Sequence, residues 1–166
     1  MSSAKTSART SVVEVGRTSD GFLLAIVGRG TMRESLALHE HVVECLEHES
    51  LSLTIDLSRC EYLDSTFLGC LVKLHKRLGG EQFEVVAPGE RRELLASMNL
   101  DRLLTVTDDP PAEVVSLTTL TAEMLCSEDL GRHSMHCHRE LAQVEGPNRA
   151  VFQRIAEQLS RELGEQ

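Results

Sequence analysis

Two hydroxyl side chains, Ser65 and Thr66, directly follow the carboxylate of Asp64, where the sequence pattern changes from strand to helix. Asp is favoured immediately before a helix because its side chain accepts a hydrogen bond from a backbone N–H group that lacks a helical partner. We therefore expect Asp64 to cap a helix that begins at Ser65. The unpaired N–H groups and the positive end of the helix dipole would then lie beside the Ser65 hydroxyl.

This position predicts that Ser65 is a phosphorylation site, with Thr66 as the second candidate acceptor. A phosphoryl group would add roughly −1.5 to −2 charges, and a helix N-terminus can tolerate that charge. A protein docked at this point would meet new bulk and repulsion beside Asp64. Losing a contact worth ~3 kcal/mol weakens binding by roughly a hundredfold or more. The alternative is that Asp64, Ser65 and Thr66 are only a helix cap.

The segments around these residues predict an α/β fold in which helices pack on a mixed sheet. We expect strands at 12–15, 22–27, 51–57, 83–87 and 103–106, and helices at 33–48, 65–78 and 90–98. The first apolar run, 22–27, is typical of a strand buried on both faces and is expected to stop at Gly28. The alternation in 51–57 predicts a strand with one buried face.

The C-terminal third has a different pattern, beyond a seam at Asp108-Asp109-Pro110-Pro111. We predict a disordered leader at 1–10, a domain at 11–112 and a wholly helical extension at 113–166. The extension should form a hairpin from a helix at 117–144, a turn at 146–148 and a final helix. The final helix has an apolar stripe that could cover the sheet or pair with a second chain, giving a homodimer: Val151, Ile155, Leu159 and Leu163.

The segment from Asp56-Leu57-Ser58 to Asp64-Ser65-Thr66-Phe67-Leu68-Gly69 resembles the STAS family, the anti-sigma factor antagonists of bacteria. The resemblance covers about residues 11 to 107. It implies a STAS-like fold, and it maps the phospho-acceptor of that family onto Ser65. It further implies a protein partner, either an anti-sigma factor or a serine kinase, which binds the unphosphorylated form. We expect the partner-binding residues to be Ser58, Asp64, Ser65, Thr66, Phe67 and Leu68.

One residue departs from the family pattern, since Phe67 stands where the motif usually has its first Gly. We expect this large apolar side chain to lie on an exposed first turn of the helix. There it could contact a partner or block one. The substitution therefore bears on the class of partner more than on the fold.

Other arrangements of reactive residues carry weaker signals. The tail contains Cys126, His133, His136, Cys137 and His138, which are zinc-ligand types, but their spacing matches no standard zinc site. No Gly-x-Ser-x-Gly elbow surrounds Ser65, as a hydrolase of the α/β class would have. Neither phosphate-binding glycine motif occurs. We therefore predict a protein that is not an enzyme and that has neither a metal ion nor a cofactor.

Composition limits the partners and the location. The net charge is −9, and only one Tyr and no Trp occur among the 166 residues. Nucleic-acid binding usually needs a basic surface, and an anionic membrane would repel this chain, so we expect neither as a partner. Five Cys without a secretory leader indicate reduced thiols and a cytoplasmic protein. Two alternatives to a phosphorylation switch remain, a constitutive scaffold or assembly subunit, and a sensor of a small ligand or metal.

Overall fold

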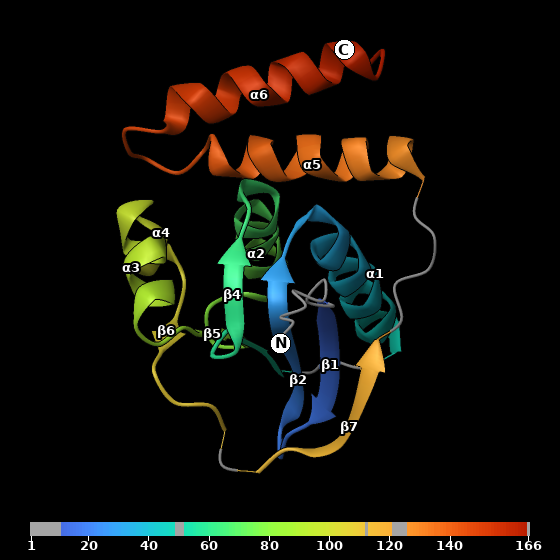
Figure 1. Ribbon diagram of the computed structural model, residues 1–166, viewed down its shortest axis with the longest axis vertical. Coiled ribbons are helices and arrows are strands. Elements are labelled where there is room, and N and C mark those ends of the chain that lie inside the picture. Colours follow the sequence, from blue (N-terminus) through green and yellow to red (C-terminus); the bar gives the residue numbers. More distant parts are fainter. Residues whose placement is uncertain (1–10, 49–51, 112, 121–125, 166) are drawn as a thin grey trace, which may run out of the picture.

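One mixed sheet organises the chain, for which a computed structural model describes residues 11–48, 52–111, 113–120 and 126–165 (Figure 1). The expected leader, 1–10, lies outside the described residues. The strands are β1 (Val12–Arg17), β2 (Gly21–Gly30), β3 (Ser52–Asp56), β4 (Cys60–Leu63), β5 (Phe83–Val86), β6 (Val106–Thr107) and β7 (Val115–Leu120). The helices are α1 (Met32–His48), α2 (Ser65–Leu78), α3 (Glu90–Ser97), α4 (Leu100–Leu103), α5 (Ser127–Leu141) and α6 (Arg149–Glu162).

The sheet has the order β6-β5-β3-β2-β1-β7, and β4 pairs with the C-terminal end of β2 at Gly28–Gly30. Pairs among β2, β3, β4, β5 and β6 are parallel, whereas β1 is antiparallel to both β2 and β7. Parallel neighbours need crossover connections, and helices α1 and α2 supply the first two. The predicted α/β mixed sheet with packed helices and a C-terminal helical hairpin is therefore confirmed.

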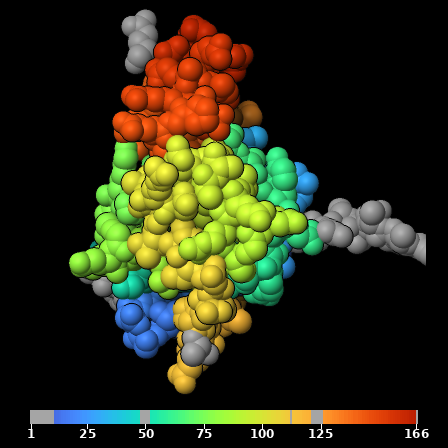
Figure 2. All heavy atoms as spheres, turned by 90° about the vertical axis from the view of Figure 1, so that its left-hand side faces the viewer, coloured from blue at the N-terminus to red at the C-terminus, as the bar shows by residue number. Residues whose placement is uncertain are grey.

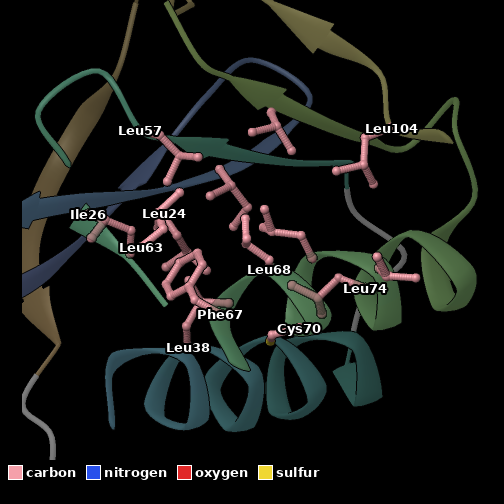
Figure 3. Close-up of a cluster of buried hydrophobic side chains, with 14 of the residues drawn as sticks. Leu24, Ile26, Leu38, Leu57, Leu63, Phe67, Leu68, Cys70, Leu74 and Leu104 are labelled. Carbon is pink, nitrogen blue, oxygen red and sulfur yellow. The ribbon is translucent and has the colours of Figure 1, made fainter. Parts of the chain in front are cut away.

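Figure 3 shows the core between the sheet and helices α1 and α2. It is built mainly from aliphatic side chains, and Phe22, Phe67 and Phe83 also belong to it. Leu24 and Ile26 of β2 face Leu38 of α1, and all three side chains are fully buried. The alternation in β3 does not leave an open face, because Thr54 and Asp56 are only 8% exposed. The prediction of a single buried face there was wrong.

Several predictions about element boundaries also fail, including the strand at 103–106, where Leu100–Leu103 is helix α4 and β6 begins only at Val106. Strand β2 continues through Gly28 to Gly30, because Gly28 adopts a φ of 94° at an irregularity in the pairing with β4. The C-terminal extension is not wholly helical, since Val115–Leu120 forms β7 and pairs with β1. Helix α5 starts only at Ser127, ten residues later than expected. The division of the chain at residue 112 stays a prediction.

The hairpin of α5 and α6 lies across the end of the molecule where β2 and β4 end and α1 and α2 begin (Figure 1). Helix α5 packs on α2 and α1, and α6 packs on the outer side of α5. In Figure 2 the hairpin forms a separate band above the surface of α3 and α4. The hairpin therefore covers helices and not the sheet. Among the described residues, no helix is both long and apolar enough to cross a bilayer.

Candidate functional site

The carboxylate of Asp64 joins the beginnings of two helices. Its Oδ1 atom accepts a hydrogen bond from the Phe67 N–H group at 2.8 Å, which caps α2 as the sequence predicts. Its Oδ2 atom accepts one from the Met32 N–H group, also at 2.8 Å, at the first residue of α1. The Asp64 N–H group donates to the carbonyl oxygen of Gly30. One side chain therefore fixes where both helices leave the sheet.

Opposing effects act on the pKa of this carboxyl group. Burial of Asp64 raises its pKa because the charged form loses water. The two backbone N–H donors at Phe67 and Met32 lower it, whereas the Glu34 carboxylate raises it further. The net shift is upward. The Asp64 carboxylate that caps α2 is thus half-buried and lies next to the hydroxyl of Ser65.

The hydroxyl of Ser65 is engaged by the C-terminal hairpin. Its Oγ atom lies 2.8 Å from Nε2 of His138 on α5. The other ring nitrogen, Nδ1, lies 2.8 Å from the carbonyl oxygen of Ser134. Because a carbonyl can only accept, Nδ1 carries the proton in the neutral ring, and Nε2 accepts from the Ser65 O–H group. Ser65 is partly buried, and its proton is directed into α5.

Two further contacts continue this arrangement along α2. The Thr66 hydroxyl is buried and lies 2.8 Å from the hydroxyl oxygen of Ser134. One turn later, a Cβ atom placed on Gly69 would lie 2.2 Å from the backbone oxygen of Cys137. That separation is far below van der Waals contact, so only Gly allows the two helix backbones to come this close. The last Gly of the sequence motif thus has a packing role against α5.

The expectation that Phe67 lies on an exposed turn is wrong. Its side chain is 1% exposed and lies among Leu24, Leu38 and Leu63 (Figure 3), and Leu68 is 2% exposed. The ring also fills the space beside Gly30, where an added Cβ would approach Phe67 Cδ2 to 3.1 Å. Helix α2 turns these two residues inward because Asp64 fixes its first turn. Phe67 therefore belongs to the core.

Ser58 lies apart from the other predicted partner residues. It is exposed on the connection between β3 and β4, and its N–H and O–H groups both donate to Oδ1 of Asp56, at 2.9 and 2.7 Å. Strand β4 separates it from Asp64, and four strand residues span about 13 Å. The Asp-x-Ser part of the motif therefore forms a turn at the opposite end of β4 from Ser65.

A second group of histidines lies next to this interface. Nε2 of His133 is 2.9 Å from the Ser35 hydroxyl of α1, and its ring lies 5.8 Å from that of His39. Burial, together with repulsion from Lys73 of α2, lowers the pKa of His133 to about 3 and that of His39 to about 4. The tail residues do not form a metal centre in the described part of the chain, where no three His, Cys, Asp or Glu side chains are grouped to hold an ion.

The comparison with family models decides the family. The model described as "Mlab, STAS domain" matches residues 13–106, which is more than half of the chain. The chain belongs to the STAS domain family. The match ends before β7, so strand β7 and the hairpin of this STAS protein lie outside the part that the family model describes.

Solved structures support the same fold. An anti-sigma factor antagonist from Mycobacterium paratuberculosis superposes with a TM-score of 0.55 at 24% identity, covering 63% of this chain and 92% of that one. A putative anti-sigma factor antagonist from Thermotoga maritima gives 0.50 at 22% identity, covering 57% of this chain and 85% of that one. At these identities the likeness shows the fold alone. No curated protein matches the sequence.

The involvement of α5 in the site was not predicted from the sequence. Four buried residues at i, i+4, i+7 and i+11 form one face of α5, namely Leu130, Ser134, Cys137 and Leu141. His138 lies next to this stripe and is 4% exposed. Polar side chains in the middle of an apolar face were a signal that this helix packs against a polar target. The target itself, Ser65, could not be identified from spacing.

Proposed function

We propose that this STAS protein is a non-catalytic regulatory module that binds a protein partner and is switched by phosphorylation of Ser65. The observation that carries the proposal is the capped start of α2. The Asp64 carboxylate holds Ser65 on the first turn of a helix, in a chain of the STAS family. That is where a new negative charge costs helix α2 itself little and changes a docking surface most.

The switching step is an ordinary phosphoryl transfer. A serine kinase would supply a nucleoside triphosphate, and Ser65 Oγ would form a bond to its terminal phosphorus. The bond from that phosphorus to the bridging oxygen would break, releasing the nucleoside diphosphate. The hydroxyl proton would pass to a base of the kinase. A phosphatase would reverse the state by transferring the phosphoryl group to water.

The partner is proposed from charge and from the family resemblance. With a net charge of −9, the chain suits a partner that has basic surface, and electrostatic complementarity of that kind speeds association. An anti-sigma factor or a serine kinase is the class that the resemblance indicates. We propose that binding takes place in the cytoplasm, at Asp64 and Ser65, and at Thr66 once its buried side chain is uncovered. Phe67 and Leu68 are excluded as direct contacts while their side chains stay buried.

Catalysis by Ser65 is disfavoured by its surroundings. A serine hydroxyl that donates to a histidine is one part of a hydrolytic site. Here, however, the pair lies between two helices whose backbones touch at Gly69 and Cys137. A substrate would have to separate α2 from α5 to reach Ser65 Oγ. The contact therefore fits a structural hydrogen bond better than a nucleophile and its base.

The first experiment is intact-mass analysis with peptide mapping of the protein purified from its native cells, during growth and under stress. The expected result is a phosphate-sized increment that maps to Ser65. An increment mapped to Thr66 would move the switch by one residue. Unmodified protein under all conditions would refute the phosphorylation proposal.

A second candidate is a constitutive scaffold or assembly subunit, and one observation favours it. The Ser65 hydroxyl is already used within the molecule, as a donor to His138. A serine that only holds α5 in place would need no kinase. This candidate predicts unmodified Ser65 together with a partner, or a second copy, that stays bound through purification. Size-exclusion chromatography with light scattering on the native protein would detect either one.

A further inference from the structure

The start of α2 is covered by a segment of the same chain. Helix α5 places Nε2 of His138 at 2.8 Å from Ser65 Oγ and the Ser134 hydroxyl at 2.8 Å from Thr66 Oγ1. Its backbone touches α2 at Gly69. These are the residues at which the proposed partner and kinase must act. A protein that docks there must first meet α5.

We propose that the hairpin of α5 and α6 is an autoinhibitory lid over Ser65, and that a phosphate on Ser65 holds this lid open. The inference rests on the proposed phosphorylation of Ser65 and adds its regulation. In the closed state neither a partner nor a kinase reaches the hydroxyl. In the open state both can. The closed lid and a phosphate on Ser65 therefore cannot both occupy the first turn of α2.

Space and chemistry both support this exclusion. A phosphoryl group on Oγ would place phosphorus and three oxygens where the His138 ring now makes a hydrogen bond of 2.8 Å. Modification also removes the hydroxyl proton that Nε2 accepts. Because Ser65 Oγ and His138 Nε2 are already at hydrogen-bond distance, the phosphoryl group fits only if α5 moves away from α2. The Asp64 carboxylate adds repulsion on the inner side of the phosphate.

The hairpin has the construction of a unit that can move as one body. Nε of Arg132 on α5 donates to Oε1 of Glu165, beyond the end of α6, at 2.7 Å. The rings of His138 and Phe152 lie 5.9 Å apart, which ties the site residue itself to α6. The hairpin also meets the rest of the domain through polar contacts at its edge, such as Asn99 Nδ2 to the carbonyl oxygen of Glu145, and through Cys137 and Leu141, which belong to the hydrophobic core. The polar contacts re-form with water when the lid opens, whereas the apolar ones are lost.

The closed lid lowers the apparent affinity of every ligand of this face. A partner that binds only the open form binds with its intrinsic affinity multiplied by the open fraction. A change that opens the lid should raise the rate at which Ser65 is modified, because only the open form exposes the hydroxyl, and modification should in turn raise the open fraction. Both directions can be measured on the full chain without knowing the partner.

The test uses full-length protein with phosphoserine placed genetically at position 65, and hydrogen–deuterium exchange as the readout. The control carries phosphoserine at position 19 instead, where Ser19 is exposed on the β1–β2 turn. We expect amides of residues 130–141 to exchange at least about tenfold faster with phosphoserine 65 than in the control. Amides of 22–26 and 53–56 should not change. Equal or slower exchange of 130–141 would overturn the proposal.

A second variant opens the lid without a phosphate. Gly69→Ala puts a Cβ atom at 2.2 Å from the Cys137 carbonyl oxygen, while alanine suits helix α2 itself better than glycine. Gly80→Ala is the matched control, because its Cβ would have no neighbour closer than 3.6 Å. We expect faster exchange of α5 in Gly69→Ala alone. Unchanged protection of α5 would count against a lid held by this contact.

Failure of the lid can be told apart from failure of the proposed function. Genetically placed phosphoserine needs no kinase, so a closed lid with phosphoserine 65 overturns the lid even if native Ser65 is phosphorylated. Unmodified native protein with a lid that opens on phosphoserine 65 overturns the proposed switch alone. If Gly69→Ala loses protection in 22–26 as well, the variant has unfolded and the phosphoserine pair decides.

Discussion

Replacing Ser65 by Ala should destabilise the folded protein, although the substitution is small and surface serines usually tolerate it. Ser65→Ala leaves Nε2 of His138 without its donor, in a side chain that is only 4% exposed. An unpaired buried acceptor costs about 1–3 kcal/mol, more than the net worth of the hydrogen bond itself. Replacing both partners by apolar groups removes that penalty. Ser65→Ala with His138→Leu should therefore lose less than the sum of the two single variants.

Equilibrium unfolding in urea measures this coupling. For a loss of about 2 kcal/mol and a slope of about 2 kcal/mol/M, the midpoint of Ser65→Ala should fall by about 1 M. The double-mutant cycle should give a coupling free energy of about 1 kcal/mol or more. A midpoint for Ser65→Ala within experimental error of the parent, with no coupling to His138, would refute the hydrogen bond and with it the lid. A real coupling makes Ser65→Ala an unsuitable silent control in phosphorylation work.

Two further predictions test the core and the histidine interface. Phe67→Ala should lower the free energy of unfolding by about 3–5 kcal/mol, because the ring is 1% exposed. Tyr62→Ala removes a side chain that is 44% exposed and should lower it by less than about 1 kcal/mol, so similar losses for the two variants would mean that Phe67 is not part of the core. Burial lowers the pKa of His133 to about 3 and of His39 to about 4 in the folded protein, so the unfolded chain binds protons at these residues at a higher pH than the folded chain does. The free energy of unfolding should therefore be constant above about pH 6.5 and fall as the pH drops toward 4. Urea midpoints measured from pH 7.5 to 4.5 would check this, and His133→Asn should flatten the profile.

Local physical chemistry predicted the start of α2 well. Asp64 occupies a position where its side chain has one good use, and the cap, the helix that follows and Ser65 at its first turn all depend only on neighbours in the chain. The long strand and helix patterns likewise predicted the α/β class. These are features that periodicity and capping determine before any tertiary contact forms.

The failures at the site are tertiary. Phe67 looked exposed because a position on a first helical turn is often exposed, and only the approach of α1 and the sheet makes it core. Strand β7 has five exposed residues and a half-buried one, so no buried face accompanies its pairing. It is a strand because β1 offers an unpaired edge. The contact between Ser65 and His138 spans 73 positions and no local pattern encodes it.

Strand β7 also sets how strongly the hairpin competes with other molecules. Only residues 121–126 separate the end of β7 from the start of α5, and β7 is hydrogen-bonded to the sheet through β1. A segment tethered by so short a connection acts at an effective concentration on the order of millimolar. A free partner present at micromolar concentration must therefore bind the Ser65 face about a thousandfold more tightly than α5 does to share it equally. The short tether thus prevents partners of low affinity from displacing α5.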